Sequence, residues 1–267
     1  MQAVILAAGE SSRFWPLNQR HKSLLKIMGR PLIFYTIESL KKAGIKDIII
    51  VQGPKKDIEQ ELKSYDLGID IKYVIQEEPK GMGNAVMEAQ ELISEPFFTL
   101  HAHKVDVGDY IKPMIEKFKE SKAELMFLGI KTDQPWLYGM LQLEGDKAKG
   151  LIEKPEKGKE PSNIKVAGIY LLPTKFFEYY KKVPEHQYAF EDALDLYMKE
   201  NEARVTIVEK EPSSFKYLWH LFEVTKLLMN SLIQKQEIHP SAKILKNVTI
   251  EGNVYIGKNT KVFEGAV

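Results

Sequence analysis

Two histidines stand at the end of an apolar run, and their spacing would let them act together. The stretch FFTLHAHKVDV, residues 97–107, starts with strand character and carries His101 and His103 at i and i+2. Alternate side chains of a strand share a face, so both rings would lie on the same side. Imidazole binds transition metals and titrates near neutral pH. The pair is therefore a candidate site, with two surface histidines on a loop as the alternative.

A second group of chemically capable residues follows the first apolar run. The segment LAAGESSRFWPLNQRHKSLLKIMGRPLI, residues 6–33, places Gly9, Ser11 and Ser12 before Arg13, and Lys22 lies further along. Glycine and small residues let backbone N–H groups approach phosphates, and a guanidinium can hold phosphate oxygens. Spacing alone leaves two interpretations open, a phosphate-binding loop or an ordinary turn between a strand and a helix.

Alternating strands and helices must position these residues. We expect strands at residues 3–6, 47–51, 71–75, 97–100 and 125–130, and helices at 32–43, 57–64, 84–93 and 110–121. Such alternation predicts βαβ units with a largely parallel sheet, whose ligand crevice lies at the carboxyl ends of the strands. Further strands at 138–144, 150–153, 165–172 and 204–208, with helices at 174–182, 191–200 and 221–232, predict an extension of the same sheet.

The tail follows a different period. Ile238, Ile244, Ile250, Ile256 and Val262 recur every six residues, and a second set with the same period is Ala242, Val248, Val254, Thr260 and Ala266. A hexapeptide β-helix gives this repeat, whereas a helix or a flat strand does not. The sequence predicts two domains, residues 1–235 and an incomplete β-helix at 236–267. Fewer than two coils are present, and an unfinished coil exposes a strand edge and an apolar end. Three alternatives follow: the chain is truncated, the catalytic domain covers the stub, or a second protomer covers it in a homo-oligomer formed through the tail.

Composition narrows the classes of partner. Among 267 residues, 38 Lys and Arg nearly balance 37 Asp and Glu, so charge gives no reason to expect a nucleic-acid or membrane partner. The chain has no cysteine, so any metal must be held by oxygen or imidazole. No targeting or membrane-spanning segment is apparent, and we expect a cytoplasmic protein.

The whole of residues 6–33 resembles the nucleotide-phosphate loop of the sugar-1-phosphate nucleotidylyltransferases, AAGxGxR…PL…K…L…GxPL. Further motifs follow in the family's order: Gln76 and Gly81 in VIQEEPKGMGNAV, Tyr138-Gly139, Glu153-Lys154-Pro155, AGIY at 167–170, and Glu191-Asp192. The resemblance covers residues 1–230, and the tail is similar to the β-helix that many members carry. It implies an α/β fold, with a Rossmann-like mixed, mostly parallel sheet of the nucleotidyltransferase type.

The resemblance also implies an activity, the transfer of a nucleotidyl group from UTP or dTTP to a sugar 1-phosphate with release of pyrophosphate. Arg13 and Lys22 would be catalytic, and the Gln76 amide would pair with N3–H and a neighbouring carbonyl of uracil or thymine. The implied nucleotide-binding residues are Leu6, Ala8, Gly9, Ser11, Ser12, Arg13, Gln76 and Gly81. The implied sugar-phosphate-binding residues are Gly139, Glu153, Lys154 and Gly168. Acyltransferase activity, common among hexapeptide β-helices, would need more coils than this tail holds.

The two aspartates that bind Mg²⁺ in the family correspond here to His103 and His220. Three interpretations follow. In the first, the site uses another divalent metal, Mn²⁺ or Zn²⁺ rather than Mg²⁺, with Asp106 as a further ligand. Alternatively no metal is needed, because two protonated imidazoles supply the positive charge. In the third, the protein binds nucleotide or sugar phosphate without turnover, as a regulatory or assembly subunit.

Overall fold

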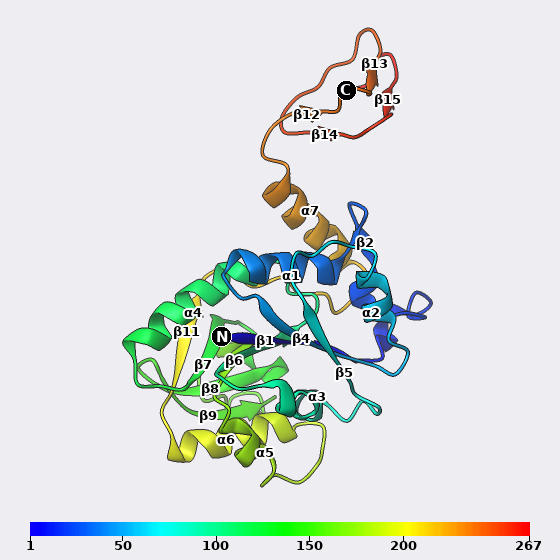
Figure 1. Cartoon of the computed structure of the whole chain (residues 1–267). Coiled ribbons are helices and arrows are strands. Elements are labelled where there is room, and N and C mark those ends of the chain that lie inside the picture. The colour runs from blue at the N-terminus through cyan, green and yellow to red at the C-terminus, as the bar shows by residue number, and fades with distance from the viewer. The chain divides into compact units, whose positions relative to one another are not determined.

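The computed structural model describes residues 1–267, which form two compact units, Met1–Leu218 and Trp219–Val267. A nine-stranded sheet is the frame of the first unit (Figure 1). Its strands are β1 (Gln2–Ala7), β4 (Asp47–Gln52), β5 (Ile71–Ile75), β6 (Phe97–His101), β7 (Leu125–Lys131), β8 (Gly139–Glu144), β9 (Lys147–Glu153), β10 (Ile164–Leu172) and β11 (Ala203–Val208). The short strands β2 (Lys26–Ile27) and β3 (Arg30–Pro31) pair separately.

The sheet is mixed, with the order β5-β4-β1-β6-β10-β7-β11-β9-β8. Strands β1, β4, β5 and β6 pair in parallel, and β11 is parallel to β7. Strand β10 runs antiparallel to both β6 and β7, and β9 runs antiparallel to β8 and β11. Both halves of the unit share this one sheet, which confirms the prediction that the second half extends the first. Because β1, β5 and β6 run in one direction, their carboxyl ends lie at one edge.

Helices cover both faces of the sheet (Figure 1). They are α1 (Leu32–Lys42), α2 (Asp57–Leu62), α3 (Met82–Glu88), α4 (Gly108–Glu120), α5 (Phe176–Tyr180) and α6 (Ala189–Glu200). Helices α1 and α4 pack together on one face, and α3, α5 and α6 cover the other. Strand β1 is buried at every position because it lies in the middle of a sheet covered on both sides. Its continuous apolar sequence, rather than an alternating one, follows from that position.

Helices α1 and α4 approach closely at Gly108. A Cβ placed on Gly108 would lie 2.4 Å from the backbone oxygen of Ser39 on α1. Gly108 N–H also donates to Ser39 Oγ at 2.8 Å. The close contact between the two helices therefore depends on the missing side chain.

We expect Gly108→Ala to lower the free energy of unfolding by about 1–3 kcal/mol, because α4 must move away from α1 to make room for the methyl group. Urea unfolding followed by circular dichroism measures the change. Gly53→Ala is the matched control, since a Cβ there would meet no atom within 4 Å. Equal stability of the two variants would contradict the close contact.

The second unit begins with α7 (His220–Leu232) and continues with four two-residue strands, β12 (Glu237–Ile238), β13 (Lys243–Ile244), β14 (Tyr255–Ile256) and β15 (Lys261–Val262). Strand β12 pairs in parallel with β14, and β13 with β15. Each residue pairs with the one 18 positions further on, Glu237 with Tyr255 and Lys243 with Lys261. The compact units divide at Leu218, which groups α7 with the strands, and the predicted domain boundary after residue 235 stays a prediction.

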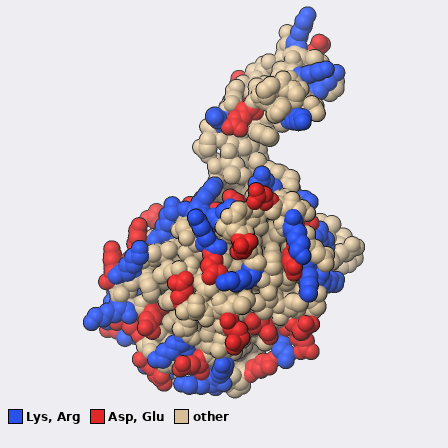
Figure 2. Space-filling model, in the orientation of Figure 1, with Lys and Arg blue, Asp and Glu red and all other residues tan.

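The surface is charged and evenly mixed. Figure 2 shows Lys and Arg interspersed with Asp and Glu over the visible face. This distribution agrees with the near-balance of charges in the sequence. None of the helices has the length and apolar character needed to cross a membrane.

Candidate functional site

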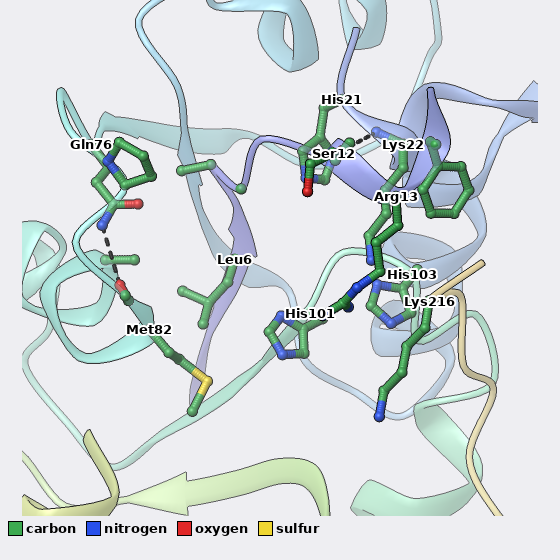
Figure 3. Close-up of a pocket in the computed structure, with 17 residues that line it drawn as sticks. Leu6, Ser12, Arg13, His21, Lys22, Gln76, Met82, His101, His103 and Lys216 are labelled. Carbon is green, nitrogen blue, oxygen red and sulfur yellow. Dashed lines mark hydrogen bonds between the residues drawn. The ribbon is translucent and has the colours of Figure 1, made fainter. Parts of the chain in front are cut away.

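A cavity of about 360 Å³ lies where β1, β5 and β6 end. Its lining comprises Leu6, Ala8, Gly9, Ser11, Ser12, Arg13, Phe14, His21, Lys22, Gln76, Pro79, Gly81, Met82, Ala85, His101, His103 and Lys216. All eight residues predicted from the resemblance to bind nucleotide are in this set, as is Lys22. In Figure 3 the basic side chains Arg13, Lys22 and Lys216 lie with the two histidine rings on one side, and Gln76 and Met82 lie opposite.

The loop after β1 is shaped to leave room for a ligand. A Cβ added to Gly9 would meet nothing within 4 Å, so open space lies beside this backbone. Ser11 has a left-handed backbone, φ 56°, at the start of the 3₁₀ turn Ser12–Phe14. Its hydroxyl accepts a hydrogen bond from Lys22 N–H at 2.9 Å. That bond connects the two ends of the loop and places the Arg13 and Lys22 regions beside one cavity.

The Lys22 ammonium is held in place by the chain just after β11. Lys22 Nζ donates to the backbone oxygen of Phe215 at 2.7 Å. The Phe215 ring is fully buried and packs on Phe14 at 4.8 Å between centroids. Burial and, to a smaller extent, the positive charges of Arg13, Lys216 and Lys104 lower the pKa of Lys22 to about 8. Because the neighbouring cations repel one another, binding of an anion at this position would be favourable.

Gln76 stands at the opposite wall, directly after β5. It is 4% exposed, and its Nε2 donates to Gly81 O at 3.2 Å and to Asn84 Oδ1 at 2.7 Å. Both amide hydrogens are therefore used within the protein. The carbonyl oxygen faces the cavity in Figure 3 and remains as an acceptor. The predicted two-point pairing with a base is thus reduced to one point, because the amide nitrogen is already engaged.

Three of the predicted sugar-phosphate residues, Gly139, Glu153 and Lys154, form a second cluster, and the fourth, Gly168, lies next to His101. A Cβ on Gly139 would lie 2.7 Å from Glu153 Oε2, so the glycine makes space for that carboxylate. Lys154 Nζ lies 3.2 Å from Tyr188 Oη and 3.9 Å from Glu153 Oε1. Gly168, with φ +73°, borders the first cavity, because its Cβ would lie 3.9 Å from His101 Cδ2. None of these four residues lines the cavity itself.

Two carboxylates of this cluster hold protons more tightly than usual. Burial raises the pKa of Glu153. Burial also raises the pKa of Glu191 to about 7, and the negative charges of Glu153 and Asp192 add to that rise. A carboxyl group that is partly protonated near neutral pH can both donate and accept hydrogen bonds. Such groups suit a ligand with several hydroxyls.

The two histidine rings lie side by side as predicted, although β6 ends at His101 and His103 lies in the turn after it. They stack with centroids 5.5 Å apart and planes 10° apart. Burial and, to a smaller extent, nearby lysines lower the pKa of His101 to about 3 and that of His103 well below its usual value. Both rings are therefore neutral at pH 7 in this site. His103 therefore supplies no positive charge while no anion is bound, and the interpretation in which protonated His103 and His220 replace the metal otherwise stays a prediction.

The side chains at this site do not suit Mg²⁺. No Asp or Glu lines the cavity, and no three His, Cys, Asp or Glu side chains in the chain are grouped so that they could hold a metal ion. Asp106, the predicted additional ligand, accepts from Ser213 N–H at 3.0 Å and lies 3.4 Å from Tyr110 Oη. His220 belongs to the second compact unit. Mg²⁺ prefers oxygen ligands and so does not fit this lining, whereas the Mn²⁺ or Zn²⁺ site at His103 and His220 stays a prediction.

The sequence motifs did not predict two lysines, one in the cavity lining and one close to it. Lys216 lines the cavity from the stretch between β11 and α7, which has no periodic pattern that would predict its position. Lys104 is only 6% exposed and follows His103 directly. Its adjacency to the histidines was the one available signal. The site thus contains more positive charge than the motifs indicate.

The geometry can be compared with known proteins. A family model described as Nucleotidyl transferase matches residues 2–219. The chain belongs to this family. Among curated members, it is 30% identical over 99% of its length to a bifunctional sugar-1-phosphate nucleotidylyltransferase/acetyltransferase of Sulfurisphaera tokodaii, and it spans 64% of that protein. It is 34% identical over 67% of its length to UTP–glucose-1-phosphate uridylyltransferase 2 of Staphylococcus saprophyticus, of which it covers 73%.

Solved structures of nucleotidyl transferases share the fold. A UTP-bound UGPase from Acinetobacter baumannii matches with a TM-score of 0.71 at 21% identity, covering 90% of this chain and 94% of that one. A glucose-1-phosphate thymidylyltransferase from Bacillus anthracis, described as putative, matches with a TM-score of 0.72 at 23% identity, covering 85% and 94%. These likenesses confirm the predicted mixed α/β fold of the nucleotidyltransferase type.

Proposed function

We propose that the chain is a sugar-1-phosphate nucleotidylyltransferase that uses UTP or dTTP and releases pyrophosphate. One observation carries the proposal: the loop after β1, Lys22 and Gln76 line a single cavity. Cations lie at one wall, and the Gln76 carbonyl oxygen, which can accept a hydrogen bond from a base, lies at the other. The second cluster, with Glu153 and Lys154, lies close enough to the cavity for the charges of Lys216 and Arg13 to act on it. A triphosphate in the cavity and a sugar phosphate at the second cluster would therefore lie next to each other.

The reaction needs positioning more than proton transfer. An oxygen of the sugar phosphate attacks the α-phosphorus and forms a new P–O bond. The bond from the α-phosphorus to the oxygen bridging the β-phosphorus breaks, and pyrophosphate leaves with the electron pair. Arg13 and Lys22 stabilise the charge on the phosphates, and Lys154 holds the nucleophile.

Selection of the nucleotide base depends on one hydrogen-bond acceptor in the protein. The Gln76 carbonyl oxygen can accept N3–H of uracil or thymine. Cytosine presents a lone pair at that position, which would face the oxygen unfavourably. UTP and dTTP fit equally well because they share this edge.

Binding without turnover is the second candidate. The absence of any carboxylate among the cavity residues favours it, since the aspartates to which His103 and His220 correspond hold the Mg²⁺ in the resembling family. Such a protein would serve as a regulatory or assembly subunit. Retained Arg13, Lys22, Glu153 and Lys154 support substrate binding under either candidate.

For the tail, we propose that residues 236–267 are the first coils of a hexapeptide β-helix and mediate self-association. Parallel pairing at 18-residue spacing supports this, because three hexads make one triangular coil. A mass of one protomer by light scattering would remove the self-association.

Pyrophosphate release tests the activity. Purified protein is given UTP or dTTP with glucose 1-phosphate or N-acetylglucosamine 1-phosphate, in Mg²⁺, Mn²⁺, Zn²⁺ or EDTA. Release that requires both substrates supports the transferase. No release under any condition, with activity appearing in the His103→Asp/His220→Asp variant in Mg²⁺, would move the assignment to the binding protein.

A further inference from the structure

Lys104 is a buried cation without a partner. It lies in residues 102–107, between β6 and α4, and is 6% exposed. Its ammonium makes no hydrogen bond and no ion pair, although its backbone N–H donates to His101 O at 3.2 Å. A buried charge costs free energy unless it is paired, so an unpaired lysine at this position requires an explanation.

The nearest carboxylates are already engaged. Asp106 and Glu211 act favourably on Lys104, but only through longer-range attraction. Asp106 accepts from Ser213 N–H with both oxygens, at 3.0 and 3.2 Å. Glu211 pairs with Lys165 at 2.7 Å. Neither carboxylate therefore neutralises Lys104 directly.

Lys104 does not line the cavity itself but lies next to Gly168, which borders it. Its Cε would be 3.9 Å from a Cβ on Gly168, the same distance that separates His101 Cδ2 from that point. Its charge acts on Lys22, and it acts on both histidine rings. The unpaired ammonium therefore belongs to the same group of cations as Lys22 and Lys216, at the position that follows His103.

We propose that Lys104, with Lys22 and Lys216, forms a phosphate site that binds the nucleoside triphosphate as the free polyanion, without a divalent ion. The proposal rests on the proposed function, and it adds that the nucleotide binds as the metal-free triphosphate. A triphosphate brings several negative charges to this group of cations, among which the Lys104 ammonium has no direct ion pair. A metal-bound triphosphate carries two fewer negative charges, and its ion would approach several cations with no carboxylate to receive it.

Isothermal titration of the full chain with UTP tests the site. We expect UTP to bind at least about tenfold more tightly in EDTA than in excess Mg²⁺, since Mg²⁺ withdraws free UTP from solution. Lys104→Met should weaken binding in EDTA roughly tenfold to a hundredfold, which corresponds to one charged hydrogen bond. Lys112→Met, an exposed lysine on α4, should leave the affinity unchanged.

A thermal melt separates loss of binding from loss of structure. Lys104→Met removes an unpaired buried charge, so it should melt at or above the temperature of the natural protein. If this variant fails to fold, Lys104→Arg, which retains the charge, should preserve the preference for EDTA.

The titration results test the metal-free site, the role of Lys104 and the proposed function separately. Equal or tighter binding in Mg²⁺ overturns the metal-free site and leaves the nucleotide cavity in place, and an unchanged affinity in folded Lys104→Met overturns the role of that lysine. Absence of UTP binding in both conditions overturns the proposed function itself.

Discussion

Lys22→Met should weaken UTP binding roughly tenfold to a hundredfold, and lower kcat/KM for pyrophosphate release by about 10²–10³. The ammonium is fixed by Phe215 O at 2.7 Å and so is already oriented before the ligand arrives. Methionine keeps the length of the side chain and removes its charge. Titration with UTP and initial rates of pyrophosphate release measure the two effects.

Lys26→Met is the matched control for this variant. Lys26 lies four residues further along the chain, is exposed, and pairs with Glu61 at 2.9 Å away from the cavity. An exposed ion pair contributes little, so affinity should stay within about twofold of the natural protein. Similar losses in Lys22→Met and Lys26→Met would mean that general surface charge, rather than the cavity, attracts the nucleotide.

The protein should lose stability in mild acid, by at least about 3 kcal/mol between pH 6.5 and pH 4. Burial lowers the pKa of His21 to about 4 and that of His101 to about 3, from an ordinary value of 6.5. The unfolded chain therefore takes up protons below pH 6.5 while the folded chain does not. Stability from these groups is complete above pH 6.5 and falls as the pH drops toward the folded pKa values.

Carboxylates also contribute to acid unfolding, so a variant must isolate the histidines. His101→Asn/His103→Asn keeps the size and polarity of the rings approximately and cannot gain a proton. Urea unfolding between pH 4 and pH 7 should give a shallower loss of stability for this variant. Parallel curves for the variant and the natural protein would show that the rings already titrate normally in the folded state.

Periodicity predicted most of the fold because each element sits in the environment that its pattern implies. Strand β1 reads as continuous apolar residues and is buried on both faces, and α1 ends within one residue of its predicted limit. The cavity could be anticipated because parallel strands bring their carboxyl ends to one edge. The position of α3 was less accurate, since its last predicted turn is the separate 3₁₀ turn Gln90–Leu92.

Charge at the site could not be predicted in the same way. Spacing predicted that the His101 and His103 rings lie together, but their protonation depends on their burial and on charges that include Lys22, which is distant in sequence. Lys104 and Lys216 belong to segments without a repeating pattern, so no local signal reveals that they meet. Gln76 donates hydrogen bonds to Gly81 and Asn84, and these partners could not be predicted because they depend on how α3 packs.

The most direct test of the nucleotide cavity compares UTP with CTP in equilibrium titrations of the natural protein. The two differ at the edge that faces the Gln76 carbonyl oxygen, whose amide nitrogen is held by Gly81 and Asn84. We predict that UTP binds roughly tenfold to a hundredfold more tightly, because CTP would place an acceptor against an acceptor. Equal affinities for UTP and CTP, or no binding of either, would contradict this account of the site.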